Sequence, residues 1–156
     1  MSVILSNILN PHYIHLNVVR DGCRDALTEV VDIVKRGSEL NDPMAFCDAL
    51  MEREEVESTY MGHGIAFPHA RTNAVDEMVV AVGRNDQGIQ FENVPEKVKL
   101  MFVIGTPVKL VQEYLSIVGC LARLLKEENI RAKLFDAENA ETFIDVIRRA
   151  ECQENL

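Results

Sequence analysis

The residues best suited to chemistry lie in one short stretch, from Gly62 to His69 (GHGIAFPH). Its glycines allow backbone torsions that other residues avoid, and they let a ligand approach the backbone closely. Pro68 fixes its own φ and restrains the residue before it to an extended conformation. We therefore expect His69 on a stiffened backbone at the end of a strand, and rigid presentation of a side chain is a common requirement of catalysis.

A histidine held in this way is suited to nucleophilic capture of a phosphoryl group. A neutral imidazole offers a free ring nitrogen near pH 7, whereas a lysine amine is protonated there. The other ring nitrogen can donate to a carbonyl, which fixes the tautomer and the ring direction. A phosphorylated imidazole remains a good phosphoryl donor, so His69 could accept the group and pass it on. The residues alone leave a plainer interpretation open, in which Pro68 and His69 form a surface turn with a solvated imidazole.

Other side chains could bind the phosphate oxygens at such a site. Arg53 is expected at the end of a helix, where its planar guanidinium could act as a two-pronged clamp. Its acidic neighbours leave open the alternative that it only balances a charged helix end. Thr59 could add a hydroxyl. His63 could also face the site, or it could be a turn residue between two glycines.

Hydrophobic periodicity predicts the helices that would position these residues. Apolar residues recur at helical spacing over 24–35, with Gly37 as a stop signal. Asp42-Pro43 and Thr106-Pro107 each read as a capping residue followed by a proline at the first helical position. The expected helices cover 24–35, 43–54, a long segment after Thr106-Pro107, 128–135 and 140–150, with fraying after Glu151.

Continuous or alternating apolar runs predict the strands between these helices. The expected strands cover 13–18, 65–67, 78–82, 89–91 and 98–104, with a hairpin turn at 85–88. Strands in the middle with helices before and after them favour an α/β fold. We expect a layered sandwich with a central mixed β-sheet flanked by helices on both faces.

Composition narrows the function classes. The chain has 156 residues, 47% of them hydrophobic and 26% charged, which fits a globular protein. With no repeat or change of composition, we expect one domain over 1–156. A formal net charge of -9 disfavours nucleic-acid binding. No signal peptide, membrane anchor or spanning segment is evident. The four cysteines show no metal or redox spacing, so we expect free thiols in the cytoplasm and no bound metal.

This stretch resembles the fructose/mannitol-type IIA domain of the bacterial sugar phosphotransferase system, and the relative of that domain used in nitrogen-related regulation. The family pattern is an arginine, a spacer ending in a threonine-containing turn, and then Gly-x-Gly-Ile-Ala-x-Pro-His. Here it reads Arg53 to Thr59 (REEVEST), followed by Gly62 to His69. A Gly-Ile-x-Phe segment at 88–91 and the turn at Thr106-Pro107 extend the resemblance over about 13–148.

The resemblance implies that His69 is phosphorylated and that Arg53 helps to hold the phosphoryl group. It implies a small histidine phosphocarrier as the donor, a IIB domain as the acceptor, and no metal or organic cofactor. Two residues depart from the family pattern. Tyr114 stands where a second histidine is common, and its phenol can donate to a phosphate oxygen but supplies no imidazolium charge. Ala70 replaces the usual glycine.

Two functions therefore remain open. The chain is expected to be a phosphoryl carrier that serves a IIB domain or uses its phosphorylation as a signal. The alternative is a regulatory protein-binding module with little or no onward transfer. Tyr114 slightly favours regulation, while the retention of both Arg53 and His69 argues against loss of phosphorylation. The sugar, if there is one, cannot be read from the chain.

Overall fold

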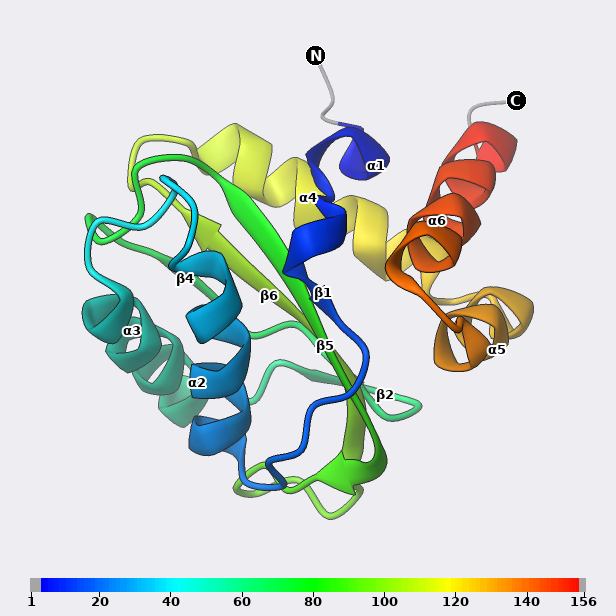
Figure 1. The fold of residues 1–156 in the computed structure, drawn as a ribbon, viewed down its shortest axis with the longest axis horizontal. Helices are drawn as coiled ribbons and strands as arrows, with labels where there is room; N and C mark the ends of the chain where they lie inside the picture. The colour runs from blue at the N-terminus through cyan, green and yellow to red at the C-terminus, as the bar shows by residue number, and fades with distance from the viewer. Residues whose placement is uncertain (1–3, 155–156) are drawn as a thin grey trace.

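The computed structural model describes residues 4–154, which fold around a mixed six-stranded sheet (Figure 1). The strand order is β1-β5-β6-β3-β2, and β4 also pairs with β6. The pairs β1–β5, β3–β6 and β4–β6 are parallel, whereas β5–β6 and β2–β3 are antiparallel. The strands are β1 (Ile14–His15), β2 (Tyr60–Gly62), β3 (Ile65–Ala66), β4 (His69–Arg71), β5 (Val79–Ile89) and β6 (Val98–Thr106).

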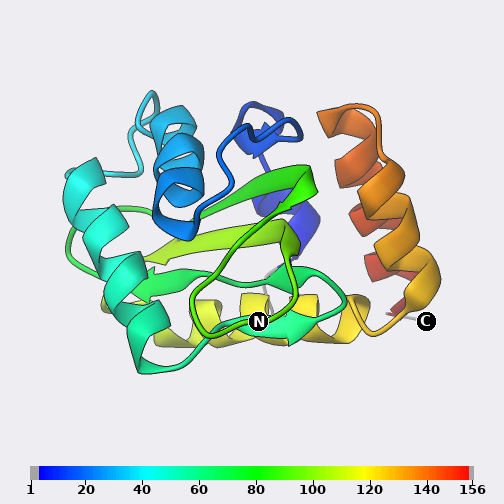
Figure 2. The ribbon, with the colours of Figure 1, turned by 90° about the horizontal axis from the view of Figure 1, so that it is seen from below.

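Helices cover both faces of this sheet, which confirms the predicted fold class. Figure 2 shows α2 and α3 on one face and α4 on the other, with α5 and α6 beside one end of the sheet. The helices are α1 (Leu5–Ile8), α2 (Cys23–Val34), α3 (Pro43–Val56), α4 (Val111–Leu124), α5 (Glu128–Asp136) and α6 (Ala140–Glu154). A 3-10 turn (Pro11–Tyr13) leads into β1.

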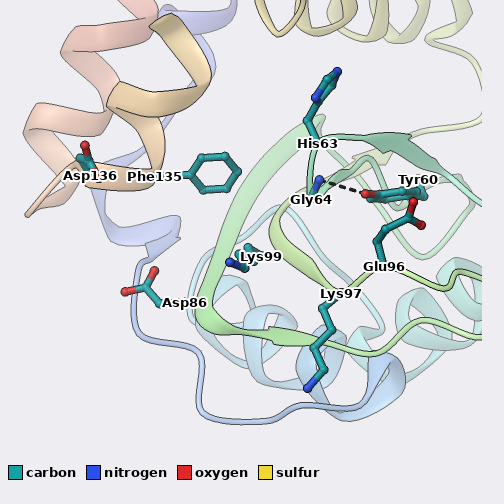
Figure 3. A pocket seen from close by; sticks show the side chains of 9 residues that line it. All are labelled: Tyr60, His63, Gly64, Asp86, Glu96, Lys97, Lys99, Phe135 and Asp136. Atoms are coloured by element: carbon teal, nitrogen blue, oxygen red, sulfur yellow. Dashed lines mark hydrogen bonds between the residues drawn. The ribbon is translucent and has the colours of Figure 1, made fainter. Parts of the chain in front are cut away.

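The turn between β2 and β3 uses the glycines of the sequence motif. Gly62, His63 and Gly64 all have positive φ, at 96°, 57° and 78°. The Gly64 nitrogen donates to the hydroxyl of Tyr60 at 3.0 Å, which closes the turn (Figure 3). Because a residue with a side chain is strained at positive φ, glycines at two of these three positions reduce the backbone strain of the turn.

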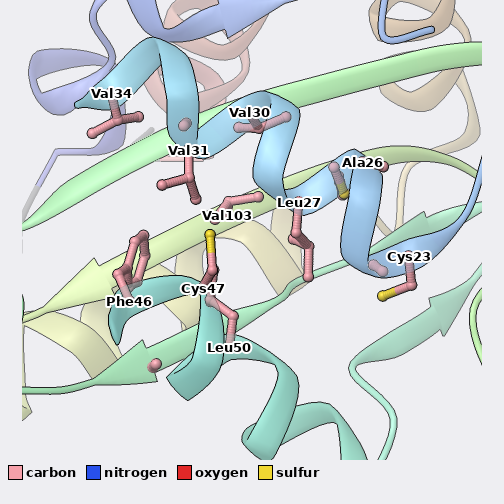
Figure 4. Packing of buried hydrophobic residues seen from close by; sticks show 14 of the residues in the cluster. Cys23, Ala26, Leu27, Val30, Val31, Val34, Phe46, Cys47, Leu50 and Val103 are labelled. Atoms are coloured by element: carbon pink, nitrogen blue, oxygen red, sulfur yellow. The ribbon is translucent and has the colours of Figure 1, made fainter. Parts of the chain in front are cut away.

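One core layer lies between the sheet and the pair α2 and α3 (Figure 4). The Asp42 carboxylate accepts from the Ala45 nitrogen at 3.1 Å and caps α3, with Pro43 at its first position as predicted. Helix α2 turns an apolar stripe inward, and this stripe consists of Ala26, Leu27, Val30, Val31 and Val34.

The second core layer lies between the sheet and α4, α5, α6 and α1. Phe102 of β6 is fully buried there and contacts Phe67 and Phe143 with ring centroids 5.9 and 6.0 Å apart. The buried carboxylate of Glu151 accepts from the nitrogens of Leu5 and Ser6 at 2.7 and 2.8 Å. This contact joins the start of the described chain to its last helix. Helix α6 continues to Glu154, so the fraying expected directly after Glu151 is not found.

The hairpin turn predicted at 85–88 is wrong. These residues lie inside β5, where the register shifts between Arg84 and Ile89, and the chain reverses later, before β6. The Asn85 amide donates to the Arg20 carbonyl at 3.0 Å, and its oxygen accepts from the Gln87 nitrogen at 2.9 Å. These side-chain bonds satisfy the polar residues within a strand irregularity, so no turn is needed.

The predicted start of the long helix is also wrong. Thr106 is the last residue of β6, and its carbonyl accepts from the Thr72 nitrogen at 3.0 Å. The Leu110 nitrogen then donates to the Pro107 carbonyl at 3.0 Å in a separate turn, and α4 begins at Val111. Of the strand expected over 13–18, only Ile14–His15 forms a strand, although the Val18 nitrogen also donates to the Arg84 carbonyl of β5 at 2.9 Å. Strands β2 and β4 are not among the predicted elements.

Candidate functional site

His69 is the first residue of β4 and is held by the backbone that precedes it. The Phe67 nitrogen donates to the Thr59 carbonyl at 3.1 Å, and the Ile104 nitrogen of β6 donates to the Pro68 carbonyl at 2.9 Å. The proline ring further restricts the residue before it. His69 therefore projects from a segment that is hydrogen-bonded on both sides.

The imidazole of His69 has a defined tautomer. Its Nδ1 lies 2.6 Å from the carbonyl oxygen of Phe67. Because a carbonyl can only accept a hydrogen bond, Nδ1 carries the proton of the neutral ring and Nε2 carries the lone pair. The Nε2 lone pair is therefore on the ring nitrogen that does not bond to the Phe67 carbonyl.

The surroundings of His69 favour the neutral ring. Burial of the imidazole is the main cause that lowers the pKa of His69 below its usual value of 6.5. The hydrogen bond to Phe67 opposes this shift, and the positive charge of Arg53 adds to it. Because protonation would occupy the Nε2 lone pair, a lowered pKa keeps that lone pair free at neutral pH.

His69 opens into a surface hollow of about 430 Å³ between α3, β4 and the start of α4. Of the residues that line it, four belong to α3, three to β4 and two to the segment 108–114. The lining residues are Ala49, Glu52, Arg53, Val56, His69, Ala70, Arg71, Val108 and Tyr114. The fold thus brings together three residues singled out in the sequence, namely His69, Arg53 and Tyr114.

Tyr114 meets His69 edge to face. The ring centroids lie 5.2 Å apart with an angle of 83° between the ring planes. Burial raises the pKa of the Tyr114 phenol, while the charges of Arg53 and Arg71 lower it in part. The phenol therefore stays protonated at neutral pH, and it lies within the electrostatic reach of two guanidinium groups. Its hydroxyl has no hydrogen-bond partner among the described residues, so it is free to donate to a ligand.

Arg53 has a structural contact as well as a place in the hollow. Its Nη1 donates to the Glu57 carbonyl at 2.6 Å, where it caps the last turn of α3. Arg53 lines the hollow together with both rings, and its positive charge lowers the pKa values of His69 and Tyr114. Arg53 thus has a contact at the helix end and a place beside His69.

The other two candidate phosphate-binding residues lie elsewhere. The Thr59 hydroxyl donates to the carboxylate of Glu54, and Thr59 supports His69 only through its backbone carbonyl. His63 is exposed at the tip of the β2–β3 turn, where its side chain points away from the neighbouring residues of a second hollow of about 760 Å³ (Figure 3). That hollow shares no lining residue with the one at His69.

Sequence reasoning missed Arg71. Residues two apart on a strand project from the same face, so His69 and Arg71 lie side by side on β4 while Ala70 turns into the core. The His-x-Arg spacing indicates that both side chains share a face only if a strand is expected at 69–71. Because β4 is not among the predicted strands, the spacing did not point to Arg71.

Arg53→Gln is expected to raise the pKa of His69, because the variant removes a nearby positive charge that disfavours the protonated ring. A pH titration of the His69 ring signals by NMR measures this shift. The wild-type pKa should lie below 6.5, and Arg36→Gln, which alters an arginine lining a different hollow, should leave it unchanged. A wild-type pKa above 6.5, or one that ignores Arg53→Gln, would contradict the prediction.

Between residues 4 and 154, no three His, Cys, Asp or Glu side chains are grouped so that they could hold a metal ion. No helix in this range is both long and apolar enough to cross a membrane.

Comparison with known proteins gives the same family at several levels. The family model described as "Phosphoenolpyruvate-dependent sugar phosphotransferase system, EIIA 2" matches residues 7–150. The chain is 37% identical over 123 residues to the fructose-specific EIIA component of Haloferax volcanii, covering 78% of this chain and 80% of that protein. It is 32% identical over 146 residues to the fructose-specific EIIABC component of Bacillus subtilis, covering 93% of this chain but only 23% of that longer protein.

Solved structures agree on the fold. The nitrogen regulatory protein IIA-Ntr of Neisseria meningitidis is 25% identical, with a TM-score of 0.84, over 93% of this chain and 99% of that one. The IIA mannitol protein of Escherichia coli, solved in complex with phosphorylated IIB mannitol, is 18% identical, with a TM-score of 0.78, over 90% of this chain and 97% of that one.

Proposed function

The chain belongs to the EIIA 2 family of the phosphoenolpyruvate-dependent sugar phosphotransferase system, and from that premise we propose that Nε2 of His69 is its phosphoryl acceptor. The observation that carries this proposal is the hydrogen bond from Nδ1 to the Phe67 carbonyl. It leaves the lone pair on Nε2, in a hollow that also contains Arg53 and the Tyr114 phenol.

The transfer step needs no proton to be removed from His69. The N–P bond of a phosphohistidine on the donor protein breaks, and its electron pair returns to the donor imidazole. A new P–N bond forms to Nε2 of His69, which is already unprotonated. Arg53 and the Tyr114 hydroxyl stabilise the charge on the phosphoryl oxygens as they move between the two rings. The reverse sequence, with a different partner, passes the group on.

Both partners of such a carrier would be proteins, and the rim of the hollow has a surface that suits them. Val56 and Val108 line the hollow and are 83% and 48% exposed, and Val111 and Leu115 of the adjoining helix α4 are 42% and 62% exposed. Exposed apolar groups gathered around a reactive side chain are typical of a docking surface. We propose the small histidine phosphocarrier as the donor and a IIB domain as the acceptor, both in the cytoplasm, where free thiols such as the four in this chain stay reduced.

Tyr114 gives the regulatory alternative a specific basis. At the position where the resemblance implies a second histidine, this chain has a neutral donor that cannot become a cation, so the phosphorylated form has one charge fewer to stabilise a partner's attack. Slow onward transfer would let the phosphorylation state of His69 act as a signal to a regulated protein. Measuring phosphoryl loss with and without a IIB domain separates the two roles.

Incubation of the wild-type chain with an active phosphorylated phosphocarrier tests the acceptor role. We expect the intact mass to increase by one phosphoryl group at neutral or mildly alkaline pH. The added mass should disappear on mild acidification, because phosphohistidine is acid-labile. An unchanged mass, with a donor shown to phosphorylate another acceptor, would contradict the proposal.

A further inference from the structure

We infer that Arg71 is a second phosphoryl-binding guanidinium of this site, an inference that rests on the proposed acceptor role of His69. Arg71 is the third residue of β4, and its backbone is paired to β6 opposite Thr106, two positions along from His69 opposite Ile104. Parallel pairing to one continuous strand fixes both residues in the same register. Their side chains therefore leave the sheet on the same side.

A hydrogen bond places the guanidinium of Arg71 at the hollow. Arg71 is one of its lining residues, and its Nη1 donates to the carbonyl of Val108, which lines the same hollow. The positive charge of Arg71 also lowers the pKa of the Tyr114 phenol against the larger effect of burial. The Tyr114 ring in turn lies edge to face against His69. A group attached to Nε2 of His69 would therefore lie among the phenol and the two guanidinium groups.

The formal charges around the hollow favour anion binding only when Arg71 is counted. A phosphoryl group brings a charge of about -1.5 to -2 near pH 7. Arg53 shares the wall of α3 with Glu52, whose carboxylate offsets its charge. One Nη of Arg53 is also committed to the Glu57 carbonyl at 2.6 Å. Without Arg71, the charged side chains lining the hollow would sum to zero.

Arg71 is free to bind an anion. Its only hydrogen bond within residues 4–154 is a long one, from Nη1 to the Val108 carbonyl at 3.3 Å. The side chain is exposed, so it can shift toward a phosphoryl group without disturbing the core. A planar guanidinium can then donate two parallel hydrogen bonds to the phosphoryl oxygens, which a lysine cannot reproduce.

The test compares Arg71→Gln with Arg36→Gln, which removes the same charge at an exposed arginine in a different hollow. Each variant is phosphorylated by the phosphocarrier and, separately, by phosphoramidate, a small donor that needs no docking surface. We expect Arg71→Gln to slow both reactions by about 10- to 100-fold, the range of a lost hydrogen bond to a charged group. Arg71→Lys should fall between, and Arg36→Gln should match wild type.

The possible results distinguish a failure of the Arg71 inference from a failure of the proposed acceptor role of His69. If Arg71→Gln is slow only with the protein donor, Arg71 serves docking and the inference is wrong. If it matches Arg36→Gln with both donors, the inference is also wrong. If wild type accepts no phosphoryl group from either donor, the acceptor role of His69 itself fails. Thermal unfolding of each variant, with a midpoint close to that of wild type as expected for an exposed residue, shows that the fold is intact.

Discussion

His69→Ala should accept no phosphoryl group from the phosphocarrier, whereas the wild-type chain gains one. The variant removes the imidazole that lines the hollow with Arg53 and Tyr114. Losing the nucleophile of a covalent step lowers the rate by a factor on the order of 10⁴ or more. At that rate, the phosphorylated product would not be detected by intact mass. Because the side chain is only half-buried and its hydrogen bond goes to the Phe67 carbonyl two residues earlier, the fold should survive.

His63→Asn is the matched control for this experiment. It also removes an imidazole from the GHGIAFPH motif, but from the exposed tip of the β2–β3 turn. Asparagine tolerates the positive φ of 57° at this position better than most residues, so the turn should keep its shape. Phosphorylation of His63→Asn should match wild type within about twofold. Acid-labile phosphorylation that persists in His69→Ala and is lost in His63→Asn would move the acceptor to the turn.

The fold class was predictable because the residues of its two core layers follow local patterns of hydrophobic spacing. The stripe on α2 follows helical spacing, and the apolar runs at 78–82 and 98–104 fall on the two central strands β5 and β6. The missed elements β2 and β4 have only three residues each and exist because β3 and β6 offer them partners. Short strands of this kind are set by long-range pairing and leave no period of their own in the sequence.

The site was predictable to the extent that its residues are fixed by separate, well-formed elements. Arg53 comes from the last turn of α3 and Tyr114 from the first turn of α4, and both helices were expected even though the start of α4 was misplaced. The direction of the His63 side chain depends on the torsions of a tight turn. The direction of the Thr59 hydroxyl depends on the neighbouring carboxylate of Glu54. Proximity to His69 in sequence was therefore a poor guide, because the turn places His63 at the exposed edge of another hollow.

The position of His69 also depends on the core behind it, which is a feature of packing rather than of the motif. The carbonyl that orients the imidazole belongs to Phe67, and the Phe67 ring packs edge to face on Phe102 at 5.9 Å. Phe102 is fully buried in β6 and also contacts Phe143 of α6. The tautomer of His69 is thus coupled to the layer between the sheet and the C-terminal helices.

Phe102→Ala should therefore impair both stability and phosphoryl acceptance. Removing a fully buried phenylalanine costs about 3–5 kcal/mol of the free energy of unfolding, because the transfer energy is lost and a cavity remains. Urea unfolding followed by circular dichroism measures this loss. The cavity also frees the Phe67 ring, so the carbonyl that holds Nδ1 of His69 becomes mobile. The phosphorylation rate should fall even under conditions where the variant is fully folded.

Phe91→Ala separates these two effects. Phe91 is as deeply buried as Phe102 but lies in the core layer on the α2 and α3 face. Its replacement should cost a similar amount of stability, about 3–5 kcal/mol, and leave the Phe67–Phe102 contact in place. If both variants lose the same stability and only Phe102→Ala slows phosphorylation of the folded protein, the core orients the nucleophile. If both variants slow phosphorylation equally, the backbone around His69 positions it alone. The packing of Phe67 on Phe102 then serves only the stability of the fold.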